Sequence, residues 1–316
     1  MNIVILDADT LGADISLEKI KELGSCTVFS GTNRNQVKER IQNAEVVIVN
    51  KVKLDSEVLE DASRLKLICL AATGFDNVDT AYCKQRGIAV SNVVGYSSHS
   101  VAQLTAAMAL SLSVNMKPYT DFVTSGGYTE SGVANRLTPV YHEIFGKTWG
   151  IVGYGNIGKE VGAVAKALGC DVIVNKRTPV SAAKSVSLDE LCKKADIITI
   201  HTPLTDETRG MISREKIAMM KNDVIIVNTA RGAVVDEQAV CDALTDKKIG
   251  AFGTDVYSTE PFGKDHPFFK IKDMDNVCLT PHMAWGSFEA RTRCIGEIAE
   301  NIKAFQRGEK RNRVEL

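Results

Sequence analysis

Several classes of protein are excluded by what this 316-residue sequence lacks. No apolar run approaches the roughly 18 residues that indicate a membrane-spanning helix. The first residues, MNIVILDAD, have no basic segment of the kind that begins a signal peptide. The formal net charge is −1, from 38 basic and 39 acidic residues, so no basic surface for nucleic acid is expected. We therefore expect a cytoplasmic protein with no membrane and no nucleic-acid partner.

Metal and serine-hydrolase chemistry also lack support in the sequence. The eight cysteines are scattered without a C-x-x-C pair, and those in apolar runs are typical of small buried hydrophobic residues. There is no H-E-x-x-H motif, no G-x-S-x-G motif and no histidine–cysteine cluster, so we expect neither a bound metal nor a serine nucleophile. Only five histidines occur, so few residues are available as a histidine proton donor.

The stretch 148–175 carries the most informative motif. An apolar strand is followed at once by a Gly-x-Gly-x-x-Gly turn, an amphipathic helix and a second strand. In such a βαβ unit the glycines permit a tight turn, close approach of a pyrophosphate and close packing of helix on strand. The alternative is a glycine-rich turn that binds nothing. The motif predicts a dinucleotide site at the helix N-terminus, formed by Gly153, Gly155, Asn156, Ile157 and Gly158.

Apolar strands and helical patterns alternate over most of the chain. This alternation predicts an α/β fold of two doubly wound domains with parallel sheets. No phosphate loop follows the first strand, where Asp7 and Asp9 would repel a pyrophosphate, so we place the cofactor in the second domain. The final helix has no strand after it and can pack back on the first domain. We therefore assign 1–100 plus 287–316 to the substrate domain and 101–286 to the dinucleotide-binding domain.

The segment 97–147 separates the two alternating regions. Residues 97–116 predict a long helix that is apolar nearly all round, as expected for a helix buried between two bodies. Residues 118–147 contain Gly126-Gly127 and Pro139, and we expect them to be irregular. Such a segment belongs on the surface or at an oligomer contact.

The predicted strands of the second domain end in polar residues. Ligands of parallel α/β sheets bind beyond the carboxyl ends of the strands, so the cofactor is expected there. Arg231, Glu260 and His282 are the notable side chains at these ends. Alone, His282 fits a structural histidine well, but Arg231 and Glu260 at neighbouring strand ends favour a catalytic one. A turn in the first domain contains Thr73 and Gly74, whose N–H groups could bind a small anion or belong to an ordinary turn.

These residues have the properties that hydride transfer to a ketone requires. A histidine can protonate the developing alkoxide, and a neighbouring carboxylate fixes its tautomer and favours its protonated form. An arginine binds a substrate carboxylate through two parallel hydrogen bonds, which a lysine cannot do. We therefore predict His282 as the proton donor, Glu260 as its partner and Arg231 as the carboxylate clamp.

These motifs resemble a known family, the D-isomer-specific 2-hydroxyacid dehydrogenases. The resemblance implies a Rossmann domain inserted into a flavodoxin-like substrate domain, an NAD- or NADP-dependent oxidoreductase and a homodimer. The body of the chain is most similar to the glycerate dehydrogenase branch, which acts on hydroxypyruvate and glyoxylate. The matching segments are the glycine loop, VNTARGAVVDEQAV with Arg231, DVYSTEP with Glu260, TPHMAW with His282, AATGFDNVDT and SVAQLTAAMAL, in the family's order over nearly the whole chain.

The resemblance also implies ligand contacts. Lys51, Thr73 and Gly74 would join Arg231 and His282 at the substrate. Two alternatives remain open: a D-lactate-type or bulkier substrate, and a binding protein of the same fold that senses the cofactor without turnover. The cofactor contacts expected beyond the glycine loop are Asn175, Lys176, Arg177, Thr202, Pro203, Thr229, Ala230, Asp255 and Ala284.

One departure from the dinucleotide motif concerns the choice of cofactor. The acidic residue expected about 20 residues after the glycine loop, which holds the ribose 2′-hydroxyl, is missing. Asn175 is instead followed by Lys176 and Arg177, and the next carboxylate is Asp189. Cations at this place can bind a 2′-phosphate, so we expect NADPH to be favoured over NADH. In the alternative, the two cations form a solvated turn and Asn175 alone serves NADH.

Overall fold

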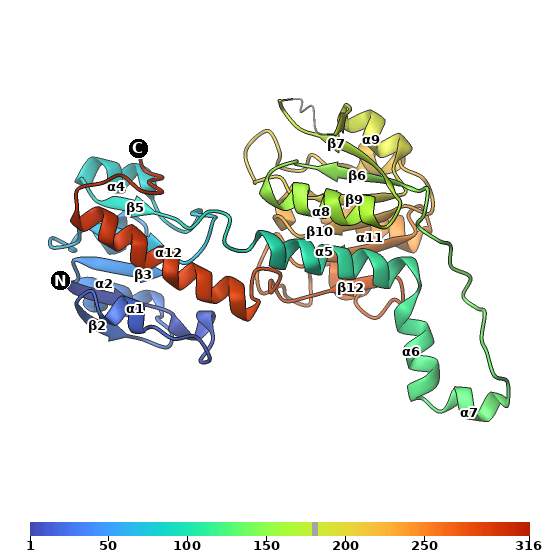
Figure 1. Ribbon diagram of the computed structural model, residues 1–316, viewed down its shortest axis with the longest axis horizontal. Coiled ribbons are helices and arrows are strands. Elements are labelled where there is room, and N and C mark those ends of the chain that lie inside the picture. The colour runs from blue at the N-terminus through green and yellow to red at the C-terminus, as the bar shows by residue number, and fades with distance from the viewer. Residues whose placement is uncertain (179–182) are drawn as a thin grey trace. The chain divides into compact units, whose positions relative to one another are not determined.

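The computed structural model describes residues 1–178 and 183–316. The chain forms two compact units, one from Met1–Ser97 with Trp285–Leu316 and the other from Ser98–Ala284 (Figure 1). Each unit contains one parallel β-sheet with helices packed on it, so the predicted α/β class is confirmed. Among the described residues, no helix has the length and apolarity needed to span a bilayer.

The first unit is built on a five-stranded sheet in the order β2-β1-β3-β4-β5, the flavodoxin-like order. Its central strands β3 and β4 are buried throughout, as parallel strands covered on both faces must be. Helices α1 and α12 pack on one face of the core, and α2, α3 and α4 on the other. The elements are β1 (Asn2–Ile5), η1 (Ala8–Leu11), α1 (Glu18–Lys21), β2 (Ser25–Val28), η2 (Arg34–Gln36), α2 (Val37–Ile41), β3 (Val46–Val49), α3 (Ser56–Leu59), β4 (Leu67–Leu70), α4 (Thr80–Arg86), β5 (Ala89–Ser91) and α12 (Phe288–Gln306).

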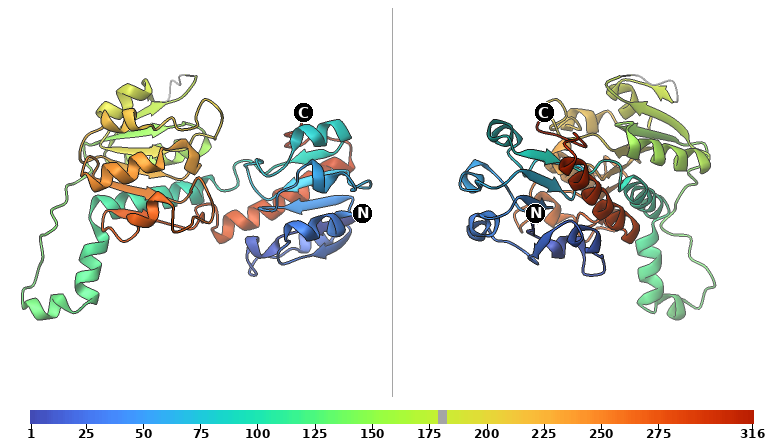
Figure 2. Two further views of the ribbon diagram at one scale, coloured as in Figure 1. Left: turned by 180° about the vertical axis from the view of Figure 1, so that it is seen from behind. Right: turned by 60° about the vertical axis from the view of Figure 1, so that its left-hand side comes forward.

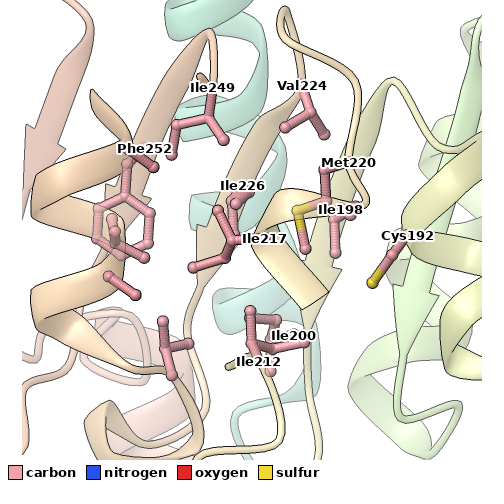
Figure 3. Close-up of a cluster of buried hydrophobic side chains, with 14 of the residues drawn as sticks. Cys192, Ile198, Ile200, Ile212, Ile217, Met220, Val224, Ile226, Ile249 and Phe252 are labelled. Atoms are coloured by element: carbon pink, nitrogen blue, oxygen red, sulfur yellow. The ribbon is translucent and has the colours of Figure 1, made fainter. Parts of the chain in front are cut away.

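The second unit is built on a seven-stranded sheet in the order β12-β11-β10-β9-β6-β7-β8. One side of its core, shown in Figure 3, packs isoleucines of β9 and β10 against Cys192 and Phe252. The short edge strand β8 was not predicted, because two residues carry no periodic signal. The elements are α5 (Ser98–Ser113), β6 (Thr148–Val152), α8 (Asn156–Ala167), β7 (Asp171–Asn175), β8 (Lys184–Ser185), α9 (Leu188–Lys194), β9 (Ile197–Ile200), α10 (Arg214–Ala218), β10 (Ile225–Asn228), η3 (Gly232–Val234), α11 (Glu237–Thr245), β11 (Ala251–Thr254), η4 (Pro267–Lys270) and β12 (Val277–Leu279).

The expectation of irregular structure over 118–147 is wrong for its first part. Two helices, α6 (Met116–Thr124) and α7 (Gly127–Ser131), occupy it and stand away from the sheet of their own unit (Figures 1 and 2). Pro118 lies in the first turn of α6, where a proline removes no helical hydrogen bond. Gly126, at φ 88°, ends one helix and begins the next. Gly126 was taken as a sign of irregular structure in the sequence, but it lies between two helices.

Helix α5 was expected to be buried nearly all round. It packs on α8, β10 and β11 within its unit and buries Val101, Thr105 and Met108. His99, Gln103 and Ala107 are exposed on the opposite side of the helix. Two of these three residues are polar, so the side of α5 that is exposed in this unit is not uniformly apolar.

Candidate active site

The glycine turn lies at the topological switch point of the seven-stranded sheet, between β6 and β9. Gly153 has φ 90°, and a Cβ there would lie 2.7 Å from the backbone of His201 and Thr202. A Cβ on Gly158 would collide with the Gly153 carbonyl. Gly155 caps α8 and has open space beside it. The turn is therefore closed toward the protein and open at the helix N-terminus, the arrangement that fits a pyrophosphate.

In the described part of the turn after β7, residues 176–178, there are two cations and no carboxylate. Lys176 and Arg177 are exposed. The side-chain amide of Asn175 donates to the carbonyl of Val186 at 3.1 Å. Asp189, the next carboxylate along the chain, forms an ion pair with Lys216. The exposed charges that the structure describes in the turn after β7 are therefore positive.

The turn after β10 is held by Asn228, a residue that the sequence analysis did not select. Its side chain accepts the N–H of Ala230 at 3.0 Å and donates to the carbonyl of Arg231 at 2.9 Å. Thr229 is buried, and its hydroxyl lies 2.9 Å from that of Thr105 on α5. The guanidinium of Arg231 also donates to the Ala230 carbonyl at 2.9 Å. The backbone from which Arg231 extends is thus fixed on both sides.

His201, beside Thr202 and Pro203 at the end of β9, is an unsuitable proton donor. Burial lowers the pKa of its ring to about 3, because the charged form would lose its hydration. Its Nε2 is buried without a hydrogen-bond partner among the described residues, and its Nδ1 lies 3.4 Å from the Thr229 hydroxyl. The ring is therefore neutral over the physiological range.

His282 and Glu260 form a close pair. The Nδ1 atom of His282 lies 2.6 Å from Oε2 of Glu260, and the two side chains are 24% and 32% exposed. Glu260 also accepts the Tyr257 N–H through Oε1 at 3.0 Å. Because Nδ1 faces the carboxylate, the ring's Nε2 is the atom that can exchange a proton with a ligand.

Asp255 holds the turn that carries His282. Its carboxylate is 1% exposed and accepts the Thr280 hydroxyl at 2.5 Å and the N–H groups of Met283 and Ala284 at 2.8 Å each. His282 has φ 53°, a left-handed conformation that a non-glycine residue adopts only when its surroundings hold it. Asp255 and Ala284 were predicted as cofactor contacts; what the structure shows is that the Ala284 N–H and the Asp255 carboxylate together hold this turn.

Arg231, Glu260 and His282 all belong to the second unit and follow the neighbouring strands β10, β11 and β12. Gly232 packs so closely on the loop of Glu260 that a Cβ would collide with the Tyr257 backbone. The structure therefore brings the three predicted catalytic residues to one end of one sheet.

Lys51, Thr73 and Gly74 lie in the first unit. Thr73 donates its hydroxyl to the Val93 carbonyl at 2.7 Å, which fixes the turn before Gly74. Lys51 is exposed on a loop at the β1–β3 switch point. Such switch points of open α/β sheets are where ligands bind.

The loop 50–52 is held by two residues that the sequence analysis missed as anchors. Asp7, 3% exposed, accepts the N–H groups of residues 50, 51 and 52 at 2.6 to 3.2 Å. The side chain of Asn77 donates to the carbonyls of Asn50 and Val52. The position of Asp7 directly after a buried strand was the available signal. These amides are occupied by the protein's own carboxylate, so a substrate anion has to bind elsewhere.

A dinucleotide turn joined to a histidine–carboxylate pair and an arginine defines an oxidoreductase that uses a nicotinamide cofactor. Residues 106–284 match the family model described as D-isomer specific 2-hydroxyacid dehydrogenase, NAD binding domain. The hydroxypyruvate reductase of Blautia hydrogenotrophica is 34% identical over 317 residues, covering 98% of each chain. The protein belongs to the D-isomer-specific 2-hydroxyacid dehydrogenase family.

Solved structures agree with this assignment. A D-lactate dehydrogenase from Aquifex aeolicus, complexed with NAD and lactic acid, has a TM-score of 0.88 at 31% identity and covers 100% of this chain and 99% of its own. An acyclic imino acid reductase (Bsp5), in complex with NADPH and D-Arg, has a TM-score of 0.87 at 30% identity and covers 99% of this chain and 100% of its own. Similar chains thus occur with either nicotinamide cofactor.

Proposed function

We propose that this enzyme reduces a short 2-oxo acid, hydroxypyruvate or glyoxylate, to D-glycerate or glycolate, and catalyses the reverse reaction. The observation that carries the proposal is the contact between His282 and Glu260. These two residues follow strands β12 and β11, and Arg231 follows the neighbouring strand β10. The relative named hydroxypyruvate reductase supports the choice of substrate. A D-lactate-type substrate is the alternative, supported by the dehydrogenase complexed with lactic acid.

When bound, the reduced nicotinamide would supply the hydride for reduction at C2 of the 2-oxo acid. His282 donates the proton of Nε2 to the developing alkoxide, and Glu260 stabilises the imidazolium form of the ring through Nδ1. Arg231 binds the substrate carboxylate, and its planar fork orients C2. We also propose that Lys51, Thr73 and Gly74 contribute to substrate binding. In the oxidative direction the neutral histidine accepts the alcohol proton.

For the cofactor, we propose NADP(H) in preference to NAD(H). The exposed cations Lys176 and Arg177 can bind a 2′-phosphate, and Asp189 is engaged by Lys216. The pyrophosphate would bind at the N-terminus of α8 over Gly155 and Asn156. Thr202, Pro203, Thr229, Ala230 and Ala284 would line the nicotinamide side, together with Asp255.

For its assembly and location, we propose a cytoplasmic homodimer. The segment 116–145 exposes large apolar side chains that a monomer would leave in water. All eight cysteines are free thiols, which suits a reducing compartment. The exposed apolar residues are Met116, Val123, Tyr128, Val133, Leu137, Val140, Tyr141 and Phe145. Sedimentation of the wild type and of a Leu137→Glu, Val140→Glu variant tests this: the wild type is expected to be a dimer and the variant a monomer.

A spectrophotometric assay tests the proposed reaction. Oxidation of NADPH and of NADH is followed over a range of concentrations of glyoxylate, hydroxypyruvate, pyruvate and a bulkier 2-oxo acid. We expect the highest kcat/KM with hydroxypyruvate or glyoxylate. A clear preference for pyruvate would favour the lactate-type alternative. Cofactor binding without turnover of any 2-oxo acid would indicate a sensor instead of an enzyme.

A further inference from the structure

A buried carboxylate lies beside the loop that carries Glu260. Glu237 is the first residue of α11, and its side chain is 9% exposed. One of its oxygens accepts the Ser258 N–H at 2.8 Å, and the other accepts the Ser258 hydroxyl and lies 3.0 Å from Nε2 of His266. A buried carboxylate is costly unless hydrogen bonds compensate it, and three donors do so here.

The hydrogen bonds of His266 assign its tautomer. Its Nδ1 accepts the backbone N–H of Phe268 at 3.2 Å, so this nitrogen carries no proton. The ring proton is therefore on Nε2, which donates to Glu237. A second proton on Nδ1 would face the Phe268 N–H, a donor against a donor. His266 thus connects the backbone of η4 to Glu237 through both of its ring nitrogens. Its role is therefore structural, unlike that of the proposed proton donor His282.

These contacts hold both ends of the segment 258–266, in which Glu260 lies. Ser258 binds Glu237 at the start of the segment, and His266 binds the same carboxylate at its end. Between them, the ring of Phe262 packs on His266, with a centroid distance of 4.9 Å. One carboxylate on α11 therefore closes the loop that presents Glu260.

We propose that Glu237 is a positioning residue for the reaction: with His266 it fixes the loop 258–266 and thereby the contact of Glu260 with His282. A loop that could move would lengthen this contact, and lost orientation lowers turnover. The inference rests on the roles proposed above for Glu260 and His282. The experiments below distinguish a failure of this inference from a failure of those proposed roles.

Glu237→Gln removes part of the hydrogen bonding between Glu237, Ser258 and His266, with little change in side-chain volume. The glutamine nitrogen cannot accept a hydrogen bond, so either Ser258 or His266 loses its acceptor. We expect kcat to fall on the order of 10- to 100-fold, with the dissociation constant of the cofactor unchanged. Asp242→Asn is the matched control, because Asp242 lies on the same helix and pairs with Arg214 on the surface. It is expected to keep wild-type kcat.

A double-mutant cycle with Glu260→Gln separates positioning from a general loss of stability. If Glu237 acts through Glu260, the double variant turns over no more slowly than Glu260→Gln alone. If the double variant instead shows the product of the two single-variant losses in kcat, the inference is overturned. If Glu260→Gln itself leaves kcat and its pH profile unchanged, the proposed role of Glu260 fails, which is a separate outcome.

Two gentler changes keep the test decisive if Glu237→Gln folds poorly. Ser258→Ala removes one donor from an exposed loop residue and is expected to lower kcat less, in the same direction. His266→Gln keeps one donor and one acceptor and is expected to retain more activity than His266→Leu. Thermal unfolding is measured for each variant. If kcat per folded molecule equals the wild-type value in all of them, Glu237 has only a structural role and the proposal is overturned.

Discussion

The Nδ1 atom of His282 lies 2.6 Å from Oε2 of Glu260, and the opposite carboxylate oxygen accepts the Tyr257 N–H. This chain of contacts fixes both the ring orientation and the nitrogen that meets the substrate. Each member of this chain of contacts can therefore be tested by changing one group.

The first prediction concerns the proton donor. His282→Ala should lower kcat of reduction on the order of 10² to 10⁴-fold, the range for losing a general acid, while cofactor binding is retained. Glu260→Gln removes the carboxylate that orients the ring through Nδ1, so kcat of reduction should fall in this variant as well. Steady-state kinetics of both variants measure these losses. Wild-type turnover in His282→Ala would rule out the assignment.

The second prediction concerns the carboxylate clamp. Arg231→Lys keeps the positive charge but loses the planar fork, so KM for the 2-oxo acid should rise strongly and kcat should fall. Steady-state kinetics and thermal unfolding are measured on the same samples. If Arg231 only supports the fold, the variant will instead lose stability with a near-normal KM per folded molecule.

The third prediction concerns the loop that carries Lys51. Asp7→Asn places an amide NH₂ where three backbone N–H groups need an acceptor, so the folded state should lose about 1–3 kcal/mol. We expect KM for the 2-oxo acid to rise several-fold while the cofactor dissociation constant stays constant. Asp61→Asn, an exposed carboxylate of the same unit, is the control. If Asp7→Asn and the wild type have equal KM values, the loop 50–52 does not contribute to substrate binding.

The fourth prediction is a pH dependence of stability caused by His201. Its pKa is about 3 in the folded protein and about 6.5 when exposed. Between these values the unfolded chain binds a proton that the folded chain excludes, so this residue makes stability rise with pH from about 3 to about 6.5. His201→Leu should therefore flatten the plot of unfolding free energy against pH in that window. His142→Asn, at an exposed histidine, should leave the slope unchanged.

The sequence allowed the main features to be predicted because they depend on local pattern. Alternating strands and helices gave the α/β class, and the glycine turn located the switch point between β6 and β9. The Glu260–His282 pair followed from the rule that parallel strands place their carboxyl ends together. Contacts such as those of Asp7 with residues 50–52 or Glu237 with His266 depend on side-chain directions across long sequence separations. No pattern along the chain encodes those directions.

The helices α6 and α7 show why boundaries are harder to predict than elements. Proline and glycine mark helix ends as often as loops, and only their position within the first or last turn decides which. Neither α6 nor α7 contains a buried residue, so no buried face marked them as helices in the sequence.

The last prediction is that the enzyme prefers NADPH. Lys176 and Arg177 are exposed at the end of β7, and Asp189 is held in an ion pair with Lys216. The ribose 2′-phosphate would therefore meet two cations, whereas the 2′-hydroxyl of NADH would find no carboxylate in this turn. One or two charge-assisted hydrogen bonds correspond to about a 10- to 100-fold preference in kcat/KM. Because the site is exposed, the preference should weaken with rising salt concentration.

Variants of Lys176 and Arg177 test the predicted preference for NADPH. Lys176→Asp should lower kcat/KM for NADPH and raise it for NADH, since a carboxylate repels the phosphate and accepts from the ribose hydroxyl. Lys193→Asp makes the same charge change on the exposed side of α9 and should leave the ratio of the two efficiencies near its wild-type value. A wild type that clearly prefers NADH would contradict the prediction. So would a Lys176→Asp, Arg177→Ala double variant that uses NADPH as well as the wild type, since the two cations would then be a solvated turn.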